Sequence, residues 1–522
     1  MVWNRKVVAG AILIAAAVLI FYNPVLKAGF LEIWDDGEYV VRNPVLESVE
    51  GLRRIWLDPG ATPQYYPMVH TTFWIEHSLW DLNPKYYHAT NIFLHALNAL
   101  LLWLLLAMLG VRGSWMAAAI FAVHPIHVES VAWITERKNT LSAFFYLSAF
   151  LSFASFYRLD SDEKKDRGER PPASHRLYAL GFVFFCLALL SKTVTATLPA
   201  ALLVVLWWKR GVLSRKDIVY TLPLFLIGGV MGLVTSFLEK THVGAGGADF
   251  DFSFLERLLI AGRALWFYIA KILWPVPLTF FYPRWQINTS EWWQYLYPAA
   301  FILIGAFLWW KRGQIGRGPL AAYFFYLFTL APALGFVNYY PMRYSFVADH
   351  FVYLASIGIF AALAALYWKG VLLLFNGKLW KLGGKKPKIL GFLPVCGVLV
   401  FLGTLTWNQG GYYRSQESIT RQNIEVNPES WIGQGTLGLI LLRQGKLDEA
   451  LIHTRRAVEL EPGDPEMRNN YGVALQRKGY YEEALKQYQE SLRIEPRYEN
   501  ARQSLRFLRI IMQRTKQPGN KK

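Results

Sequence analysis

The sequence predicts an all-α protein in which a membrane domain of about eleven transmembrane helices precedes a soluble domain of helical repeats. The chain has 522 residues, of which 54% are hydrophobic and 16% are aromatic, and residues 1–408 contain many long apolar runs. Apolar runs of that length are typical of polytopic membrane proteins. Beyond residue 408 the composition changes to that of soluble helices, and a 34-residue period begins.

The apolar runs in residues 1–408 approach or reach the length that crosses the hydrocarbon core of a bilayer. The run 177–208 is long enough for two short spans joined at Ser191-Lys192-Thr193, and residues 114–123 add one more. Residues 255–275 carry charges at near-helical spacing, so we expect an interfacial or re-entrant helix there. The remaining spans are expected at residues 8–22, 91–110, 140–157, 219–238, 296–310, 319–336, 350–368 and 389–407.

The formal charge of +18 follows from membrane topology, and we expect no nucleic-acid binding. Lys and Arg gather in the short connections between spans, which is the pattern of cytoplasmic loops. This orientation places the N-terminus inside, and it places the first loop (residues 24–90) and the C-terminus outside. The basic connections contain Lys164, Lys165, Arg167, Arg170 and Arg176; Lys209, Arg210, Arg215 and Lys216; Lys311, Arg312 and Arg317; and Lys378, Lys381, Lys385, Lys386 and Lys388.

The soluble part repeats every 34 residues, as Pro428, Pro462 and Pro496 show. Gly438 and Gly472 recur at the same interval, and small residues at this period are typical of tetratricopeptide repeats. Such an array either forms a concave groove for a polypeptide or serves as a scaffold or oligomerisation module. The repeat domain is expected at residues 409–522, with repeats at 429–462 and 463–496 and flanking helices at 414–427 and 497–513.

Asp35 and Asp36 follow the first apolar run by about ten residues, within the sequence Trp34-Asp35-Asp36-Gly37. Charged groups next to a bilayer are costly, so a carboxylate pair there indicates either a solvated loop or an active site. The simpler interpretation is a loop that caps the start of a helix. The residues alone leave both interpretations open.

Histidines and cations on the same predicted face form a second group of candidates. His124, His127 and Glu129 could bind zinc or manganese, although their spacing is not a recognised metal signature. Alternatively, the histidines hold a loop through hydrogen bonds or contact a substrate phosphate. The cations near the outside ends of spans could bind phosphate oxygens or act as interfacial anchors. These cations are Arg137, Lys138, Lys192, Arg263 and Arg343.

Taken together, the motifs resemble the transmembrane and tetratricopeptide-repeat protein O-mannosyltransferases, which are glycosyltransferases of the GT-C class. The most specific motif is the His-Pro-x-His-x-Glu block at residues 124–129, and the resemblance covers the whole chain. Animal members have long repeat arrays, whereas this chain has about two and a half repeats, which indicates a bacterial relative. The motifs are Trp34-Asp35-Asp36, residues 83–98, residues 124–139, Ser191-Lys192, Arg263-Ala264-Leu265 and residues 349–354.

The resemblance implies an inverting enzyme that moves a sugar, mannose or another hexose, from a polyprenyl-phosphate donor to Ser or Thr hydroxyls of exported proteins. It implies an integral protein of the bacterial inner membrane, surrounded by lipids, with its active site and repeats on the periplasmic side. The base maps onto Asp36, in preference to Asp35. The candidates for holding the donor phosphate or organising the pocket are Glu129, Arg137, Lys138, Arg263, Arg343, His124 and His127. A divalent metal, a lipid or cell-envelope glycan as acceptor, and a non-catalytic scaffold remain alternatives.

Overall fold

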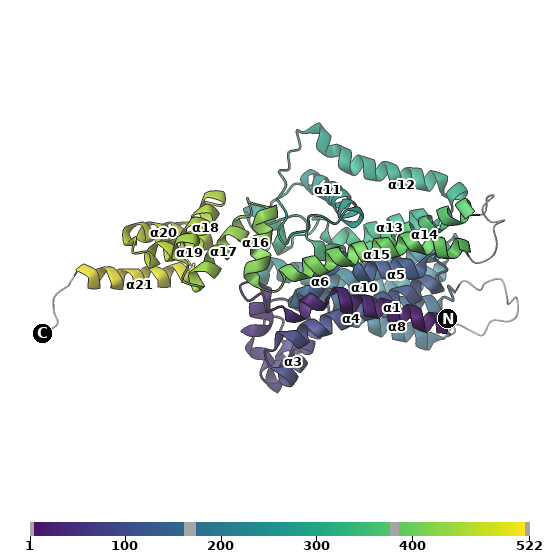
Figure 1. Ribbon diagram of the computed structural model, residues 1–522, viewed down its shortest axis with the longest axis horizontal. Coiled ribbons are helices and arrows are strands. Elements are labelled where there is room, and N and C mark those ends of the chain that lie inside the picture. Colours follow the sequence, from purple (N-terminus) through teal and green to yellow (C-terminus); the bar gives the residue numbers. More distant parts are fainter. Residues whose placement is uncertain (1–4, 161–173, 376–385, 517–522) are drawn as a thin grey trace. The chain divides into compact units, whose positions relative to one another are not determined.

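The computed structural model describes residues 5–160, 174–375 and 386–516, and the regular elements in these ranges are all helical (Figure 1). The chain divides into two compact units. Unit 1 comprises Met1–Leu278 and Trp285–Arg414, and unit 2 comprises Thr279–Arg284 and Ser415–Lys522. Of the residues in the predicted basic connections, Lys164, Lys165, Arg167, Arg170, Lys378, Lys381 and Lys385 lie outside the described residues.

Unit 1 is a bundle of long helices joined by short helical turns. Local sequence explains where several helices begin: Ser214 and Asp217 form a capping box at the start of α10, and Ser253 and Glu256 form another at the start of α11. The main helices are α1 (Arg5–Phe21), α4 (Pro84–Met108), α5 (Ser114–Val123), α6 (Val128–Ala132), α7 (Arg137–Phe156), α8 (His175–Leu189), α9 (Leu198–Arg210), α10 (Arg215–Leu238), α11 (Phe254–Leu273), α12 (Leu296–Ile315), α13 (Gly318–Leu330), α14 (Ser356–Phe375) and α15 (Lys386–Tyr412).

The expected count of eleven spans is not confirmed. Within the described residues, five helical segments are long and apolar enough to cross a membrane, and a bent pair formed by α5 and Pro125–Ala132 brings the number to six. A break in one apolar run accounts for part of the difference. The run 177–208 is broken by a short 3-10 helix at Thr193–Thr197, which leaves α8 and α9 with 15 and 13 residues. The five segments are Pro84–Met108, Ile134–Phe156, Arg215–Val243, Ser356–Leu373 and Gly391–Tyr412.

The first loop forms a compact helical layer instead of an extended connection. It contains α2 (Val49–Leu57), α3 (Pro67–Trp80) and a π-helical turn at Gly37–Val41. Tyr39, Phe73 and Tyr87 are buried in a cluster that also includes Ile134, so the layer packs against the segment that precedes α7. Burial of large aromatic side chains gives this layer a hydrophobic core of its own. The layer therefore positions Asp35 and Asp36, just before the π-helical turn, close to the segment that precedes α7.

Unit 2 has the helix pairs expected for tetratricopeptide repeats (Figure 1). A Cβ atom on Gly438 would lie 2.5 Å from the Thr454 side chain, and one on Gly472 would lie 2.6 Å from the Tyr488 ring. These glycines are therefore needed where the two helices of each repeat cross. The helices are α16 (Gln416–Val426), α17 (Trp431–Arg443), α18 (Leu447–Leu460), α19 (Pro465–Arg477), α20 (Tyr481–Ile494) and α21 (Glu499–Lys516).

A six-residue strap, Thr279–Arg284, belongs to unit 2 although it is distant in sequence. The side-chain amide of Asn423 donates to the hydroxyl of Thr279 (2.8 Å) and to the carbonyl of Phe281 (2.9 Å). Asn427 donates to the same carbonyl at 3.1 Å. The repeat domain predicted at residues 409–522 is thus completed by a segment that the 34-residue period does not reveal.

Candidate active site beside the first loop

Asp36 is fully buried and acts as a clamp between two backbone segments. Its Oδ2 accepts a hydrogen bond from the Leu31 N–H at 2.8 Å, and its Oδ1 accepts one from the Thr135 N–H at 3.0 Å. Burial raises the pKa of Asp36 to about 7, although these two backbone hydrogen bonds act to lower it. Each carboxylate oxygen therefore already has a donor, and the side chain fixes the first loop to the turn before α7.

Asp35 is the accessible carboxylate of the pair. Its side chain is 42% exposed, and its Oδ2 lies 3.6 Å from Nζ of Lys138, whose side chain is 9% exposed. Desolvation raises the pKa of Asp35, and the neighbouring Lys138 ammonium opposes that shift. The expected preference for Asp36 as the base is not supported by this geometry, because Asp36 is enclosed while Asp35 can meet a substrate.

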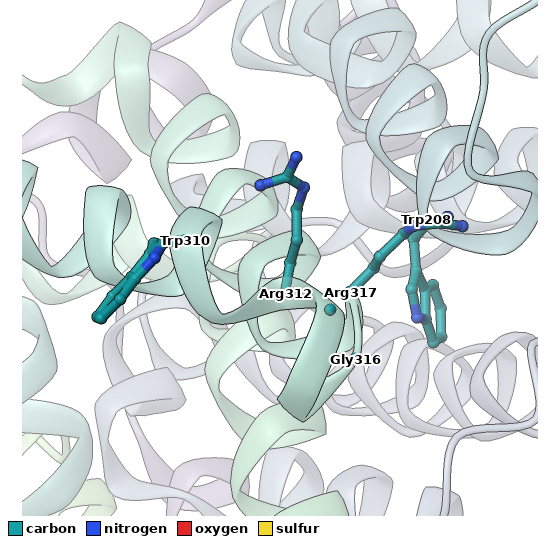
Figure 2. A pocket seen from close by; sticks show the side chains of 6 residues that line it. Trp208, Trp310, Arg312, Gly316 and Arg317 are labelled. Carbon is teal, nitrogen blue, oxygen red and sulfur yellow. The ribbon is translucent and has the colours of Figure 1, made fainter.

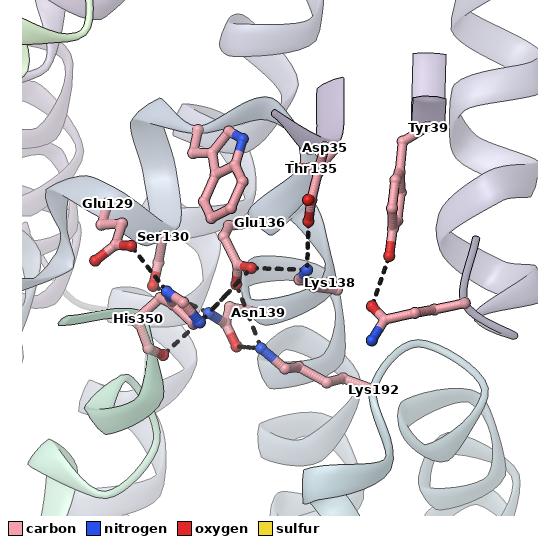
Figure 3. Close-up of polar contacts among 12 residues, drawn as sticks. Asp35, Tyr39, Glu129, Ser130, Thr135, Glu136, Lys138, Asn139, Lys192 and His350 are labelled. Atoms are coloured by element: carbon pink, nitrogen blue, oxygen red, sulfur yellow. Dashed lines mark hydrogen bonds and ion pairs between the residues drawn. The ribbon is translucent and has the colours of Figure 1, made fainter. Parts of the chain in front are cut away.

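Lys138 belongs to a buried charge cluster in which two ammonium groups share one carboxylate (Figure 3). Glu136 Oε1 lies 2.9 Å from Lys138 Nζ, and Glu136 Oε2 lies 3.3 Å from Lys192 Nζ. Lys192 also donates to Asn139 Oδ1 at 2.8 Å, and Asn139 donates to Glu136 Oε2 at 2.5 Å. Burial lowers the pKa of Lys192 to about 8, although Glu136 acts to raise it. Asp35 thus faces a buried cluster of paired charges, with Lys138 as its nearest member.

His350 and Glu129 extend the cluster on the side away from Asp35 (Figure 3). His350 Nδ1 lies 2.9 Å from Glu129 Oε1, and the His350 carbonyl accepts a hydrogen bond from Asn139 at 3.0 Å. Burial lowers the pKa of His350 to about 3, so the ring is neutral at physiological pH. Glu129 therefore contacts the cluster through His350.

Arg137 does not reach the cluster, although it is adjacent to Lys138 in sequence. Its guanidinium is fully buried, pairs with Glu76, and donates to Asn91 Oδ1 at 2.7 Å and to the Tyr87 carbonyl at 2.8 Å. A guanidinium with this many acceptors is a structural tie between α3, α4 and α7. The geometry therefore removes Arg137 from the candidates for contacting a donor phosphate.

The two histidines of the His-Pro-x-His block hold the chain through hydrogen bonds and ring packing. His124 Nε2 bonds to the Ile272 carbonyl at 2.9 Å, and its Nδ1 accepts from the Ile126 N–H at 3.2 Å. The His127 ring packs 4.5 Å from the Phe121 ring and 4.8 Å from the Tyr353 ring, between centroids. In residues 5–160, 174–375 and 386–516, no three His, Cys, Asp or Glu side chains gather to hold a metal ion.

The remaining predicted cations, Arg263 and Arg343, contact other residues of unit 1. The Arg263 guanidinium lies 4.5 Å from the centroid of the Trp285 ring, and Arg343 Nε lies 3.2 Å from Asp249 Oδ2. Of the predicted cations the structure brings Lys138 beside Asp35, and Lys192 is linked to Lys138 through Glu136. The sequence does not single out Asn139, which carries the hydrogen bonds that link Lys192, Glu136 and His350.

A second polar chain, not anticipated from the sequence, borders Lys138. The Lys138 ammonium lies 5.4 Å from the centroid of the Tyr39 ring, and the Tyr39 hydroxyl donates to Gln64 Oε1 at 2.5 Å. Gln64 in turn donates to Glu239, which follows α10. Glu239 is separated from Asp35 by more than two hundred residues, so no local motif could have indicated this arrangement.

The described helices and the repeats define the class of the molecule, an integral membrane protein with a tetratricopeptide-repeat domain. The Tetratricopeptide repeat family matches residues 402–465 and 436–499. Beyond this class, the chain is similar to several proteins named protein O-mannosyl-transferases, which confirms the resemblance seen in its motifs.

Three relatives illustrate the extent of the similarity. The protein O-mannosyl-transferase TMTC3 of Mus musculus is 34% identical over 151 residues, 27% of this chain and 16% of that protein. TMTC1 of Homo sapiens is 34% identical over 156 residues, 27% of this chain and 18% of that protein. The protein O-mannosyl-transferase F38B6.6 of Caenorhabditis elegans is 23% identical over 443 residues, 80% of this chain and 58% of that protein. The matched segments thus span less than a fifth of the first two proteins and somewhat over half of the third.

Proposed function

We propose that this chain is a membrane glycosyltransferase that transfers mannose or another hexose from a polyprenyl-phosphate donor to Ser or Thr hydroxyls of proteins. The observation that carries the proposal is the half-exposed carboxylate of Asp35, held 3.6 Å from the ammonium of Lys138 at the edge of a buried charge cluster. The relatives are named as protein O-mannosyl-transferases, which supports the same chemistry here.

Asp35 would act as the general base on the acceptor hydroxyl. Its raised pKa makes the carboxylate a better proton acceptor, while Lys138 keeps it ionised near neutral pH. The hydroxyl oxygen forms a bond to the anomeric carbon as its proton passes to Asp35. The bond from that carbon to the phosphate oxygen breaks, and the lipid phosphate leaves with the electron pair. A displacement in one step inverts the anomeric centre and needs no nucleophilic side chain.

Lys138 and Lys192 would bind the phosphate of the donor. Both ammonium groups contact Glu136 and Lys138 also pairs with Asp35, so a phosphate would bind there by replacing some of these carboxylate contacts with its own oxygens. A fixed positive charge near the leaving oxygen stabilises the charge that develops as the bond to phosphate breaks. Asp36, Arg137 and His124 would instead keep the backbone in place through the hydrogen bonds described above.

The acceptor is proposed to be a polypeptide that binds to the repeats of unit 2. Tetratricopeptide arrays present concave surfaces on which extended peptides bind. We place the site and the repeats on the extracytoplasmic face, as the basic connections predict, and a bacterial inner membrane is the proposed location.

The experiment that tests the function is mass spectrometry of exported proteins from cells with and without this chain. Hexose on Ser or Thr residues that disappears with the chain, and returns with the wild-type chain but not with Asp35→Asn, is the expected result. Removal of residues 415–522 separates the acceptor classes. If the truncated chain is still produced in the membrane and still modifies the same proteins, the repeats do not present the acceptor.

A further inference from the structure

Unit 1 contains an open cavity of about 600 Å³ whose lining is aromatic and cationic (Figure 2). Figure 2 shows Arg317 directed toward Trp208, while Arg312 projects from the end of α12. The lining residues include no carboxylate; they are Trp208, Trp310, Arg312, Gly313, Gly316 and Arg317.

The cavity lies at the opposite end of α7 from Asp35. Arg210, two residues after Trp208, donates to the carbonyl of Tyr157 at 2.9 Å, and Tyr157 follows the last residue of α7. Lys138, the partner of Asp35, lies at the first turn of the same helix. Because α7 has 20 residues, its two ends are about 30 Å apart, which is the thickness of a hydrocarbon core.

Within the described residues the two arginines of the cavity have no carboxylate partner, unlike Arg210; the Arg312 guanidinium donates to the Trp309 carbonyl at 2.5 Å and lies 4.3 Å from the centroid of the Trp309 ring. Arg210 pairs with Asp217 at 2.9 Å, and Lys209 donates to the Leu109 carbonyl at 3.2 Å. Neither Arg312 nor Arg317 forms an ion pair in the part of the chain that the structure describes. Two guanidinium groups without carboxylates form an electrostatic site for an anion.

The lining of the cavity is open at its two glycines. A Cβ atom added to Gly313 or to Gly316 would have no neighbouring atom within 4 Å. Gly316 has a φ of 85°, a left-handed conformation that favours glycine, and it sets the turn that brings Arg317 to the start of α13. The space beside the two guanidinium groups is therefore large enough for a substituted phosphate.

The surroundings indicate that this anion is carried by a membrane lipid. Along α12, Ile302, Leu303 and Trp310 are exposed, although each is apolar or aromatic. Although α12 is not among the five segments long and apolar enough to cross a membrane, exposed aliphatic residues followed by tryptophan and basic residues are typical of helices at the headgroup level of a bilayer. Such a cavity would receive a headgroup from the side of the bilayer.

We propose that this cavity binds the phosphate group of an anionic membrane lipid, with Arg312 and Arg317 contacting the phosphate oxygens and Trp208 and Trp310 flanking the lipid. The inference is independent of the proposed transferase activity, because the cavity and Asp35 lie at opposite ends of α7.

The test is native mass spectrometry of the full chain in detergent, with phosphatidylglycerol and phosphatidylcholine as probes. Wild-type protein is expected to retain phosphatidylglycerol in preference to phosphatidylcholine. The Arg312→Gln/Arg317→Gln variant is expected to bind phosphatidylglycerol about tenfold more weakly, since it loses charge-assisted hydrogen bonds. Arg112→Gln is the matched control, because Arg112 is an exposed arginine that follows α4 at the same end of the unit.

A second pair of variants distinguishes loss of lipid binding from loss of folding. Gly313→Glu places a carboxylate in the open lining and is expected to expel the lipid, whereas the neutral Gly313→Gln is expected to retain it. Displacement of the lipid by inorganic phosphate would support the site and would show that soluble phosphates also bind to it. Equal retention of phosphatidylglycerol by wild type, Gly313→Glu and the double arginine variant would overturn the proposal.

Discussion

Asp35→Asn is expected to abolish most of the transfer activity without destabilising the protein. General-base catalysis typically contributes about 10²–10⁴-fold to the rate, which is about 3–5 kcal/mol in the activation free energy. The stability cost is small, because the Asp35 side chain is 42% exposed and its contact with Lys138 is 3.6 Å. The buried Lys138 ammonium keeps its contact with Glu136 at 2.9 Å in this variant, so losing the half-exposed Asp35 partner should cost about 1 kcal/mol in the free energy of unfolding.

Asp36→Asn is expected to reduce the stability of the protein directly and its transfer activity only indirectly. An asparagine offers one oxygen and one NH₂ group, so either the Leu31 N–H or the Thr135 N–H would face a donor. A buried unsatisfied N–H costs about 1–3 kcal/mol, and the first loop would separate from the turn before α7. Asp36→Asn is therefore expected to lower the melting temperature, and its activity would fall as a consequence of misplacing Asp35.

The assay measures hexose occupancy on exported proteins in cells that lack the chain and carry each variant at equal membrane levels. Melting temperatures of the purified full-length variants measure the effect of each substitution on stability. Glu32→Gln is the control, since Glu32 is an exposed carboxylate in the same loop and forms no ion pair within the described residues. Wild-type occupancy in Asp35→Asn, with normal protein levels, would refute the assignment of Asp35 as the base.

Four other outcomes are expected. Lys138→Met removes the charge that lowers the pKa of Asp35, so the acid limb of the pH–rate profile should move to higher pH; an unchanged limb would disconnect the two residues. Lys192 has a pKa of about 8, so donor affinity should weaken above pH 8 in wild type, and this dependence should be absent in Lys192→Gln. The pKa of Asp36 is raised from 3.8 to about 7, so its contribution to stability is present below about pH 4 and lost as the pH rises through 7; the difference in melting temperature between wild type and Asp36→Asn should shrink over this range. Asn423→Ala leaves the Thr279 hydroxyl and the Phe281 carbonyl with fewer partners and should destabilise unit 2 by about 1–3 kcal/mol in chemical denaturation, whereas the exposed Asn500→Ala should have little effect.

The repeats could be predicted closely because their signal is local. The prolines and glycines recur every 34 residues, and each glycine marks a crossing where a side chain would collide, as at Gly438 and Gly472. The strap at Thr279–Arg284 could not be predicted, since its hydrogen bonds to Asn423 join residues more than a hundred positions apart. Periodicity reports the contacts within a repeat and contains no information on a distant segment that completes the array.

The membrane helices were predicted less well in number than in position. Hydropathy identifies apolar residues but does not show where the backbone bends, as it does by 55° between Ser114–Val123 and Pro125–Ala132. Proline lacks an N–H and restricts the preceding residue, which explains why a run that is apolar throughout is not a straight helix there. A prediction from apolar composition therefore overestimates the length of the straight helices.

The adjacent pairs Asp35–Asp36 and Arg137–Lys138 show why sequence alone could not divide the site residues into roles. Both pairs lie on helical backbone, where successive side chains point about 100° apart. The two members of each pair therefore lie in different surroundings. Asp36 and Arg137 turn into the packed interface of the first loop and bind backbone groups, and Asp35 and Lys138 meet at its edge. The rotation of each helix is fixed by buried residues such as Tyr39 and Ile134. The proposed base is therefore positioned by its neighbour: the buried Asp36 holds the loop so that the exposed Asp35 stands beside the cationic cluster.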